Sequence, residues 1–202
     1  MSSGNPRVGA ETPKTGGGKL VVLSAPSGAG KTTIAREIMS RIPLLQFSVS
    51  ATTRPARPGE VEGKDYFFLT KHEFRRRVDA GGFVEWEELY GDFYGTLRRE
   101  TDLALQQGRH LLFDVDVRGG LSIRRNYPEA LLIFIRPLNM SVLQERLRNR
   151  RTESDTTLAR RLERVPMELE QGELFDYQVV NDQLAQAVQE VQKIVEHHLF
   201  HS

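Results

Sequence analysis

A glycine-rich segment ahead of Lys31 and Thr32 is the part of the sequence best suited to phosphate chemistry. Residues 24–33 read Ser-Ala-Pro-Ser-Gly-Ala-Gly-Lys-Thr-Thr, close to the P-loop pattern of Gly, four residues and Gly-Lys-Ser/Thr, with Ala25 in place of the first glycine. Glycines let the backbone curl so that its N–H groups point at one anion, and a helix beginning there adds its positive dipole end. A glycine-rich turn without a ligand does not explain the lysine and threonine. The segment therefore predicts a nucleoside triphosphate site, with Lys31 at the β- and γ-phosphates and Thr32 on Mg²⁺.

Two arginines and two tyrosines farther along suit a second phosphate. Arg54 and Arg57 lie in Thr-Thr-Arg-Pro-Ala-Arg-Pro-Gly-Glu, where two prolines stiffen the chain and favour a bidentate grip on a phosphate dianion. Tyr66 and Tyr94 each offer a hydroxyl that can complete such a cradle. Solvated surface arginines, and half-buried tyrosines satisfied by the backbone, are the alternatives at this point.

Acidic residues stand next to apolar runs. Glu85 interrupts one such run, and Asp114 and Asp116 follow another at residues 111–113. An acid at the carboxyl end of a parallel strand lies where α/β folds bind their ligands, although a surface carboxylate is the commoner case.

Arginines crowd the region between residues 146 and 164. Phosphoryl transfer needs cations on the moving group, and a protein supplies little else beyond positioning. A solvated basic helix face is the alternative for most of them. The residues are Arg146, Arg148, Arg150, Arg151, Arg160, Arg161 and Arg164.

The order of the predicted strands and helices that position these residues indicates an α/β protein with a mostly parallel sheet and helices on both faces. A helix from about residue 31 carries isoleucines at 34, 38 and 42 and should end at Pro43. Residues 46 to about 95 break the alternation and predict a small, more antiparallel insertion, with a helix capped by Thr70 and Glu73. Core strands are predicted at 20–23, 111–113, 131–135 and 178–180, and a terminal helix buries Leu184, Val188, Val191, Val195 and Leu199.

Composition restricts the class of protein. The 202 residues include 39% hydrophobic and 27% charged side chains, with a net charge of +1 and no cysteine. So small a charge argues against nucleic acid as a partner, and without cysteine no disulfide or thiolate metal site can form. No apolar run reaches the length of a membrane span, so no membrane partner is expected, and the composition fits a reducing cytoplasm. Residues 1–18 predict a disordered tail.

The ordered set of motifs resembles the guanylate kinase family, from Lys19 to the terminal helix. The phosphate loop is common to many kinases, whereas the complete set is specific to this family. The resemblance implies transfer of the γ-phosphoryl group of ATP to GMP, giving ADP and GDP, with Mg²⁺ as cofactor. The matching segments are 48–54, 59–66, 83–86, 94–96, 114–119 and 180–182.

The resemblance also implies a role for individual residues. The ATP-binding residues would be Ala25, Pro26, Ser27, Gly28, Ala29, Gly30, Lys31 and Thr32. The GMP-binding residues would be Ser50, Arg54, Arg57, Glu60, Tyr66, Glu85, Tyr94, Thr96 and Asp116. Catalytic roles fall to Lys31, Arg54 and the lid arginines Arg150 and Arg161, and metal roles to Thr32 and, through water, Asp114. Asn181 is expected on the adenine side, and Arg151 replaces a glycine expected after Arg150.

Guanine chemistry agrees with the two carboxylates expected at the base. Guanine presents N1–H and N2–H₂ donors beside an O6 acceptor. Glu85 and Asp116 can accept from the donors, while a hydroxyl such as Ser50 or Thr96 can donate to O6. Adenine would leave a carboxylate unpaired, and readout of this kind discriminates by roughly 10⁴-fold or more.

The resemblance divides the chain into a core at 19–49, 97–139 and 171–202, a GMP-binding insertion at about 50–96 and a helical lid at about 140–170. Two other functions would explain part of the same pattern. Guanylate-kinase-like scaffold domains bind peptides in the acceptor cleft but usually lack a working phosphate loop, which is present here. A kinase for UMP or AMP would not need Glu85 and Asp116. The sequence leaves a homo-oligomer open.

Overall fold

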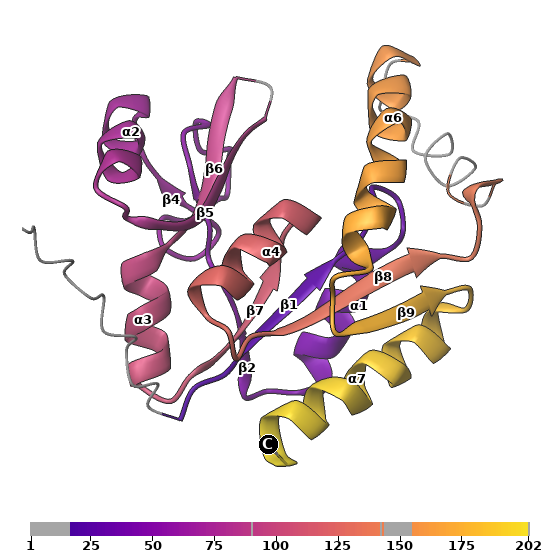
Figure 1. Ribbon diagram of the computed structural model, residues 1–202. Coiled ribbons are helices and arrows are strands. Elements are labelled where there is room, and N and C mark those ends of the chain that lie inside the picture. The colour runs from indigo at the N-terminus through magenta and orange to yellow at the C-terminus, as the bar shows by residue number, and fades with distance from the viewer. Residues whose placement is uncertain (1–16, 90, 142, 144–154, 202) are drawn as a thin grey trace, which may run out of the picture.

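A five-stranded parallel sheet forms the centre of the computed structural model, which describes residues 17–89, 91–141, 143 and 155–201, with side chains at 155–161 excepted. The strand order is β2-β7-β1-β8-β9, and each neighbouring pair is parallel. The sheet and its covering helices confirm the α/β class (Figure 1). The strands are β1 (Leu20–Ser24), β2 (Leu45–Phe47), β7 (His110–Asp114), β8 (Leu131–Pro137) and β9 (Tyr177–Asn181).

The central strand β1 is buried on both faces because its alternate side chains enter two separate apolar cores. Val21 and Leu23 pack with α1 (Lys31–Arg41) and α7 (Leu184–His201). Leu20 and Val22 pack with α3 (Arg98–Gln106) and α4 (Val117–Asn126) on the opposite face. This double covering explains why the core strands read as continuous apolar runs rather than as alternating patterns.

A second, four-stranded sheet lies above one end of the first. Its order is β4-β3-β6-β5, and the β5–β6 and β3–β6 pairs are antiparallel, whereas β3 and β4 run parallel. Helix α2 (Lys71–Asp79) packs Phe74 between Phe83 and Phe93, with ring centroids 4.2 and 5.3 Å apart, which gives this sheet a core of its own. The strands are β3 (Ala51–Thr52), β4 (Phe67–Phe68), β5 (Phe83–Leu89) and β6 (Asp92–Leu97).

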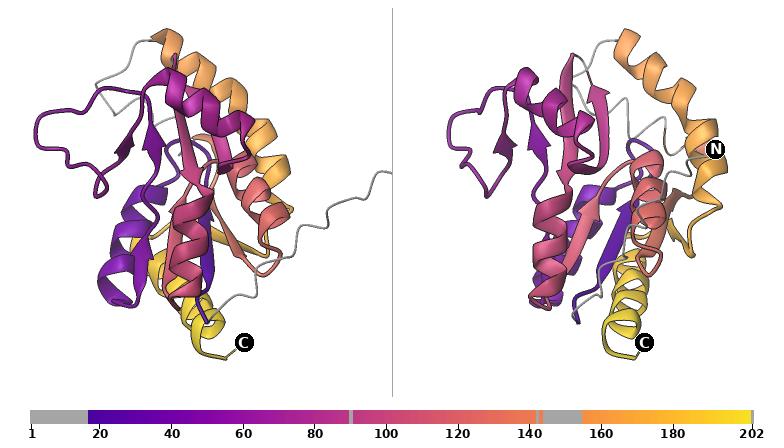
Figure 2. Two further views of the ribbon diagram at one scale, coloured as in Figure 1. Left: turned by 90° about the vertical axis from the view of Figure 1, so that its left-hand side faces the viewer. Right: turned by 60° about the vertical axis from the view of Figure 1, so that its left-hand side comes forward.

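Helix α6 (Asp155–Gly172) stands across from the small sheet (Figure 1). Figure 2 shows α6 and the small sheet rising from the same end of the parallel sheet. That end holds the carboxyl end of β1 and the loop into α1, so the fold brings the phosphate loop between them. No helix in the described part of the chain is long and apolar enough to cross a membrane.

Most expected elements are confirmed, with two differences. The four predicted core strands are present, but β2 adds a fifth at the sheet edge, where Phe47 is 46% exposed and gives no buried pattern. The Thr70 cap is confirmed, since its side chain accepts from the Glu73 N–H. Leu184 is 42% exposed instead of lying on the buried face of the terminal helix, because it begins that helix. Residues 1–16 of the expected tail lie outside the described residues.

Candidate active site

The phosphate loop connects β1 to α1 and requires glycine at its end. Gly30 is the N-cap of α1 in the left-handed region, with φ of 95°, and Gly28 has φ of 88°. A Cβ on Gly30 would also collide with the side-chain amide of Asn181. Backbone conformation and close packing therefore both select glycine at position 30.

Asn181, at the end of β9, supports this loop from behind. Its side-chain amide donates to the Ala29 carbonyl at 2.8 Å, and the residue is only 4% exposed. The structure thus gives Asn181 a partner in the loop backbone, a role that the expected adenine contact did not include. The hydrogen bond joins the loop to the carboxyl end of the edge strand β9.

The functional side chains of the loop meet the end of β7. Strands β1 and β7 are parallel, with Leu23 opposite Asp114, so the carboxylate lies beside the start of α1. Lys31 forms an ion pair with Asp114 and donates to the Val115 carbonyl at 2.9 Å. The Thr32 hydroxyl donates to Asp114 at 3.3 Å. The lysine and the hydroxyl of the loop are therefore in contact with a carboxylate from a distant segment, as their predicted roles require.

A pocket of about 290 Å³ opens over the loop. It is lined by the expected ATP-binding residues except Ala29, whose side chain is fully buried. Three charged side chains that line the pocket from other elements, Glu87, Arg164 and Glu168, were not among the expected site residues. Ala25 lines the pocket and is otherwise buried in the apolar core, which suits a small side chain at the position of the missing glycine.

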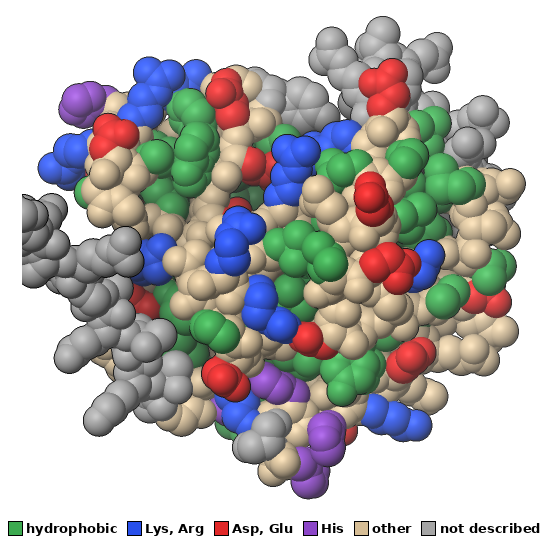
Figure 3. Space-filling model, viewed as in Figure 1, with side chains coloured by type: hydrophobic (Ala, Val, Ile, Leu, Met, Phe, Trp, Pro, Cys, Tyr) green, Lys and Arg blue, Asp and Glu red, His purple; other side chains and the backbone are tan. Residues whose placement is uncertain are grey.

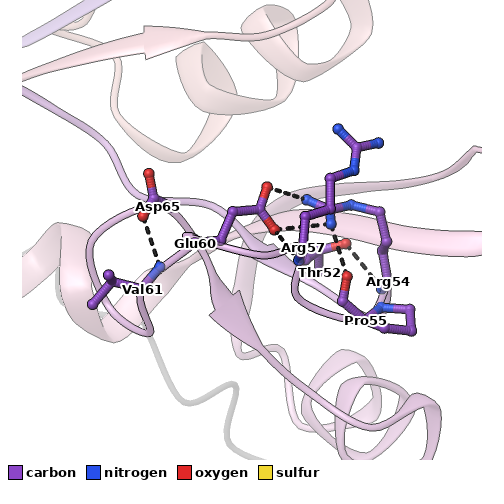
Figure 4. A network of polar contacts seen from close by, with 7 residues as sticks. All are labelled: Thr52, Arg54, Pro55, Arg57, Glu60, Val61 and Asp65. Carbon is purple, nitrogen blue, oxygen red and sulfur yellow. Dashed lines mark hydrogen bonds and ion pairs between the residues drawn. The ribbon is translucent and has the colours of Figure 1, made fainter.

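Arg54 is fixed by Glu60 in the stiff loop that precedes β4. Its two terminal nitrogens donate to the two Glu60 oxygens at 3.0 and 2.9 Å, a bidentate pair (Figure 4). The same carboxylate accepts from the Arg57 backbone N–H at 2.7 Å. These hydrogen bonds, that from Arg54 above all, lower the pKa of Glu60. Glu60 was expected to bind GMP. In the structure its carboxylate orients Arg54.

The Arg57 guanidinium makes no hydrogen bond or ion pair with any described residue and points away from Glu60 (Figure 4). The Arg54 guanidinium lies over the Tyr66 ring, 5.2 Å from its centroid. The Tyr66 and Tyr94 rings meet edge to face with centroids 6.3 Å apart. Three members of the expected phosphate cradle, Arg54, Tyr66 and Tyr94, therefore form one contiguous group.

The acidic residues expected at the base converge on a cavity of about 320 Å³. Glu85 and Thr96 are opposite each other on β5 and β6, and the Thr96 hydroxyl donates to Glu85 at 2.6 Å. Burial, with a smaller contribution from Asp116, raises the pKa of Glu85. The Thr96 proton is directed at Glu85, so of the two residues expected to donate a hydroxyl to the base, Ser50 is the one that lines the cavity. The cavity also contains Lys31, Asp114, Tyr66 and Tyr94, so it joins the acceptor group to the donor loop.

Glu87 is a functional candidate that sequence reasoning missed. It lies two residues beyond Glu85 on β5, so both side chains point to the same face. Glu87 lines the loop pocket as well as the acceptor cavity. Burial, then the charge of Asp116, raise its pKa to about 7. The period of two along the strand was the signal that could have found it.

Helix α6 supplies Arg164 and Glu168, one helical turn apart. Arg164 donates to Asp116 at 3.1 Å and lies 3.6 Å from Glu168, which is 6% exposed. Arg164 was one member of the arginine crowd, whereas no pattern singled out Glu168. Arg150 and Arg151 lie outside the described residues, as does the side chain of Arg161. Their expected lid roles stay predictions.

Comparison with known proteins adds to this geometry. A family model described as guanylate kinase matches residues 17–198. The chain is 48% identical to a guanylate kinase of Chlorobium luteolum over 86% of this chain and 89% of that protein. It is 50% identical to a guanylate kinase of Salinibacter ruber over 85% of this chain and 92% of that protein. The crystal structure of guanylate kinase from Anaplasma phagocytophilum is similar, with a TM-score of 0.69 and 30% identity, and the match covers 92% of this chain and 88% of that one. Matches of this extent and identity show that the chain belongs to the guanylate kinase family.

Proposed function

We infer that this protein transfers the γ-phosphoryl group of ATP to GMP, giving ADP and GDP. The observation that carries this inference is the shared cavity, in which Lys31 of the donor loop lies with Glu85, Tyr94 and Asp116. A reaction between two nucleotides needs such a space, because both reacting phosphates must reach it together. Family membership supports the same function.

Guanine recognition is assigned to Glu85 and Asp116. The two carboxylates accept from the N1–H and N2–H₂ donors, and Ser50 donates to O6. Thr96 holds Glu85 in place through its 2.6 Å hydrogen bond. Adenine cannot satisfy these groups, since it carries an acceptor at N1 and a donor at N6.

The GMP phosphate is assigned to Arg54, Arg57, Tyr66 and Tyr94. Arg54 is preorganised by its bidentate pair with Glu60, and the Arg57 guanidinium, which pairs with no described residue, brings a second positive charge. The two tyrosine hydroxyls complete the cradle. Holding the dianion in one orientation aims one of its oxygens at the donor phosphate.

Mg²⁺ is the proposed cofactor, and the residues present fit it. A threonine hydroxyl and a carboxylate in contact beside a phosphate loop, here Thr32 and Asp114, are the oxygen donors that Mg²⁺ prefers. Thr32 would bind the ion directly and Asp114 through water. The bound ion neutralises negative charge on the donor phosphates.

The proposed reaction is a direct in-line transfer. An oxygen of the GMP phosphate attacks the γ-phosphorus, the new P–O bond forms, and the bond to the β,γ-bridging oxygen breaks. Lys31 and the loop N–H groups hold the donor phosphates, and Arg54 positions the attacking phosphate. Arg150 and Arg161 are proposed to close over ATP from a lid at about 140–170. No covalent enzyme intermediate is required.

We also propose that the parallel-sheet core at 19–49, 97–139 and 171–202 carries the donor site and that the insertion at about 50–96 carries the acceptor. The reaction is placed in the cytoplasm, where both nucleotides are available. Label transfer tests the function: with ATP labelled at its γ-phosphate, the label should enter GDP when GMP is present. Release of the label as inorganic phosphate, equal with and without GMP, would contradict the proposal.

A further inference from the structure

A chain of polar contacts runs from the phosphate loop to the base-reading carboxylate. Glu168, on α6, interacts with the Ser27 backbone and lies 3.6 Å from Arg164. Arg164 in turn donates to the Oδ2 atom of Asp116 at 3.1 Å. The contacts therefore link donor loop, α6 and acceptor site through side chains that the reaction described above does not use.

Asp116 is held at both of its oxygens. Its Oδ1 atom accepts from the Gly119 N–H at 2.8 Å, as the N-cap of α4, and its Oδ2 atom accepts from Arg164. A carboxylate has about four lone-pair positions, so each oxygen keeps one for a ligand. The two contacts therefore fix the plane of the carboxylate without filling its capacity to accept from guanine.

The charges around Asp116 show what Arg164 adds. Glu85 and Glu87 crowd the same space, and the charge of Asp116 contributes to raising the pKa of each. Lys31 is already paired with Asp114. Among the residues whose side chains the structure describes, Arg164 is therefore the cation that is hydrogen-bonded to Asp116. Glu168 keeps the Arg164 guanidinium in place from the other side.

We propose that Arg164 is a positioning residue for the acceptor base: it holds the Asp116 carboxylate in the orientation that receives the N–H donors of a guanine monophosphate, with Glu168 as its anchor. The proposal rests on the proposed function. Arg164 acts through Asp116 and does not touch the reacting atoms. Removing it should weaken acceptor binding equally in the ground state and the transition state, which raises KM more than it lowers kcat.

Arg164 also lines the loop pocket, so direct contact with the donor phosphates is the competing role. Steady-state kinetics separate the two for Arg164→Ala, Arg164→Lys and the control Arg136→Ala, which removes an exposed arginine paired with Glu173. We expect Arg164→Ala to raise the KM for GMP by about 10-fold or more, with kcat and the KM for ATP changed by less than about 3-fold. Arg164→Lys should recover part of the loss, and the control should match the wild type.

A double-mutant cycle with Asp116→Asn then tests whether the effect passes through Asp116. The double variant should be no worse than Asp116→Asn alone, because the carboxylate that Arg164 positions is already absent. Losses that multiply, or an effect of Arg164→Ala confined to the KM for ATP or to kcat, would overturn the proposal. Thermal melting of each variant checks that it is folded. A wild-type protein without GMP-dependent turnover would instead overturn the proposed function.

Discussion

The donor and acceptor halves of the site are built in different ways. The donor half is a single short loop whose backbone curls at Gly28 and Gly30 and is held from behind by Asn181. The acceptor half is assembled from side chains on an irregular loop, two antiparallel strands and the start of α4, among them Arg54, Glu85 and Asp116.

Under the proposed function, this difference predicts what each half should recognise. Backbone N–H groups bind any polyphosphate, because they contact charge that all nucleoside triphosphates share. Side-chain carboxylates read one base, since each must find a matching donor. The donor half should therefore be sensitive to backbone changes, and the acceptor half to the loss of single side-chain contacts such as that between Glu60 and Arg54.

The largest expected effect is on the donor half at Lys31. Lys31→Ala should lower turnover by about 10³-fold, because the positive charge at the β- and γ-phosphates is lost, while the fold is retained. A coupled assay of ADP release measures it. Lys193→Ala, on the exposed side of α7, is the matched control and should keep wild-type turnover. A near-wild-type rate for Lys31→Ala would contradict the donor assignment.

Gly30→Ala tests whether the donor half depends on its backbone. A side chain at this positive φ costs about 1–2 kcal/mol of unfolding free energy, and the collision with Asn181 adds to that cost. Gly91→Ala, with φ of 84° and nothing near the added Cβ, carries the backbone cost alone. Denaturant unfolding should therefore rank Gly30→Ala below Gly91→Ala. Equal stabilities would remove Asn181 from the explanation.

Glu60→Gln tests side-chain positioning in the acceptor half. The variant keeps the size of the side chain but weakens the bidentate pair that holds Arg54, so the KM for GMP should rise about 10-fold. Glu73→Gln, which loses exposed pairs with Arg76 and Arg77, is the control. If the KM for GMP falls in Glu60→Gln, charge on Arg54 matters more than its orientation.

The smallest expected effect is a pH dependence at Glu87. Its pKa of about 7 in the folded protein lies above the unfolded value of 4.5, so folding disfavours the ionised form. The resulting penalty is absent below the unfolded pKa and grows as the pH rises through 7. After solvent screening it should reach about 1 kcal/mol. Glu87→Gln should therefore gain stability over the wild type at about pH 8 but not at about pH 4, below the unfolded pKa; a gain equal at both would contradict the shift.

The sequence predicts most of the donor half because the loop that forms it is contiguous. Lys31, Thr32 and the glycines lie within a few residues of one another, and the apolar runs on either side indicate a strand and a helix. Asp114 was also predicted, since the end of a parallel strand is a position that topology alone brings to the site.

The acceptor half could be predicted only in part. Its residues were identified by their types and motifs, but which side chains pair with one another depends on tertiary packing. Three hydrogen bonds show this. Thr96 on β6 bonds to Glu85 on β5, and Arg164 on α6 bonds to Asp116 at the start of α4. Arg54 bonds to Glu60 six residues along the same loop. Figure 3 shows basic side chains on the face around α4, and the sequence alone does not indicate which acidic side chain each of them contacts.

Acceptor selectivity tests the central claim most directly. The measurement is kcat/KM for GMP, AMP and UMP at saturating ATP and Mg²⁺, with ADP release as the readout. The carboxylates Glu85 and Asp116 predict a preference for GMP of about 10⁴-fold over the other two. Values for AMP or UMP within about 10-fold of that for GMP would contradict the reading of guanine by these two side chains.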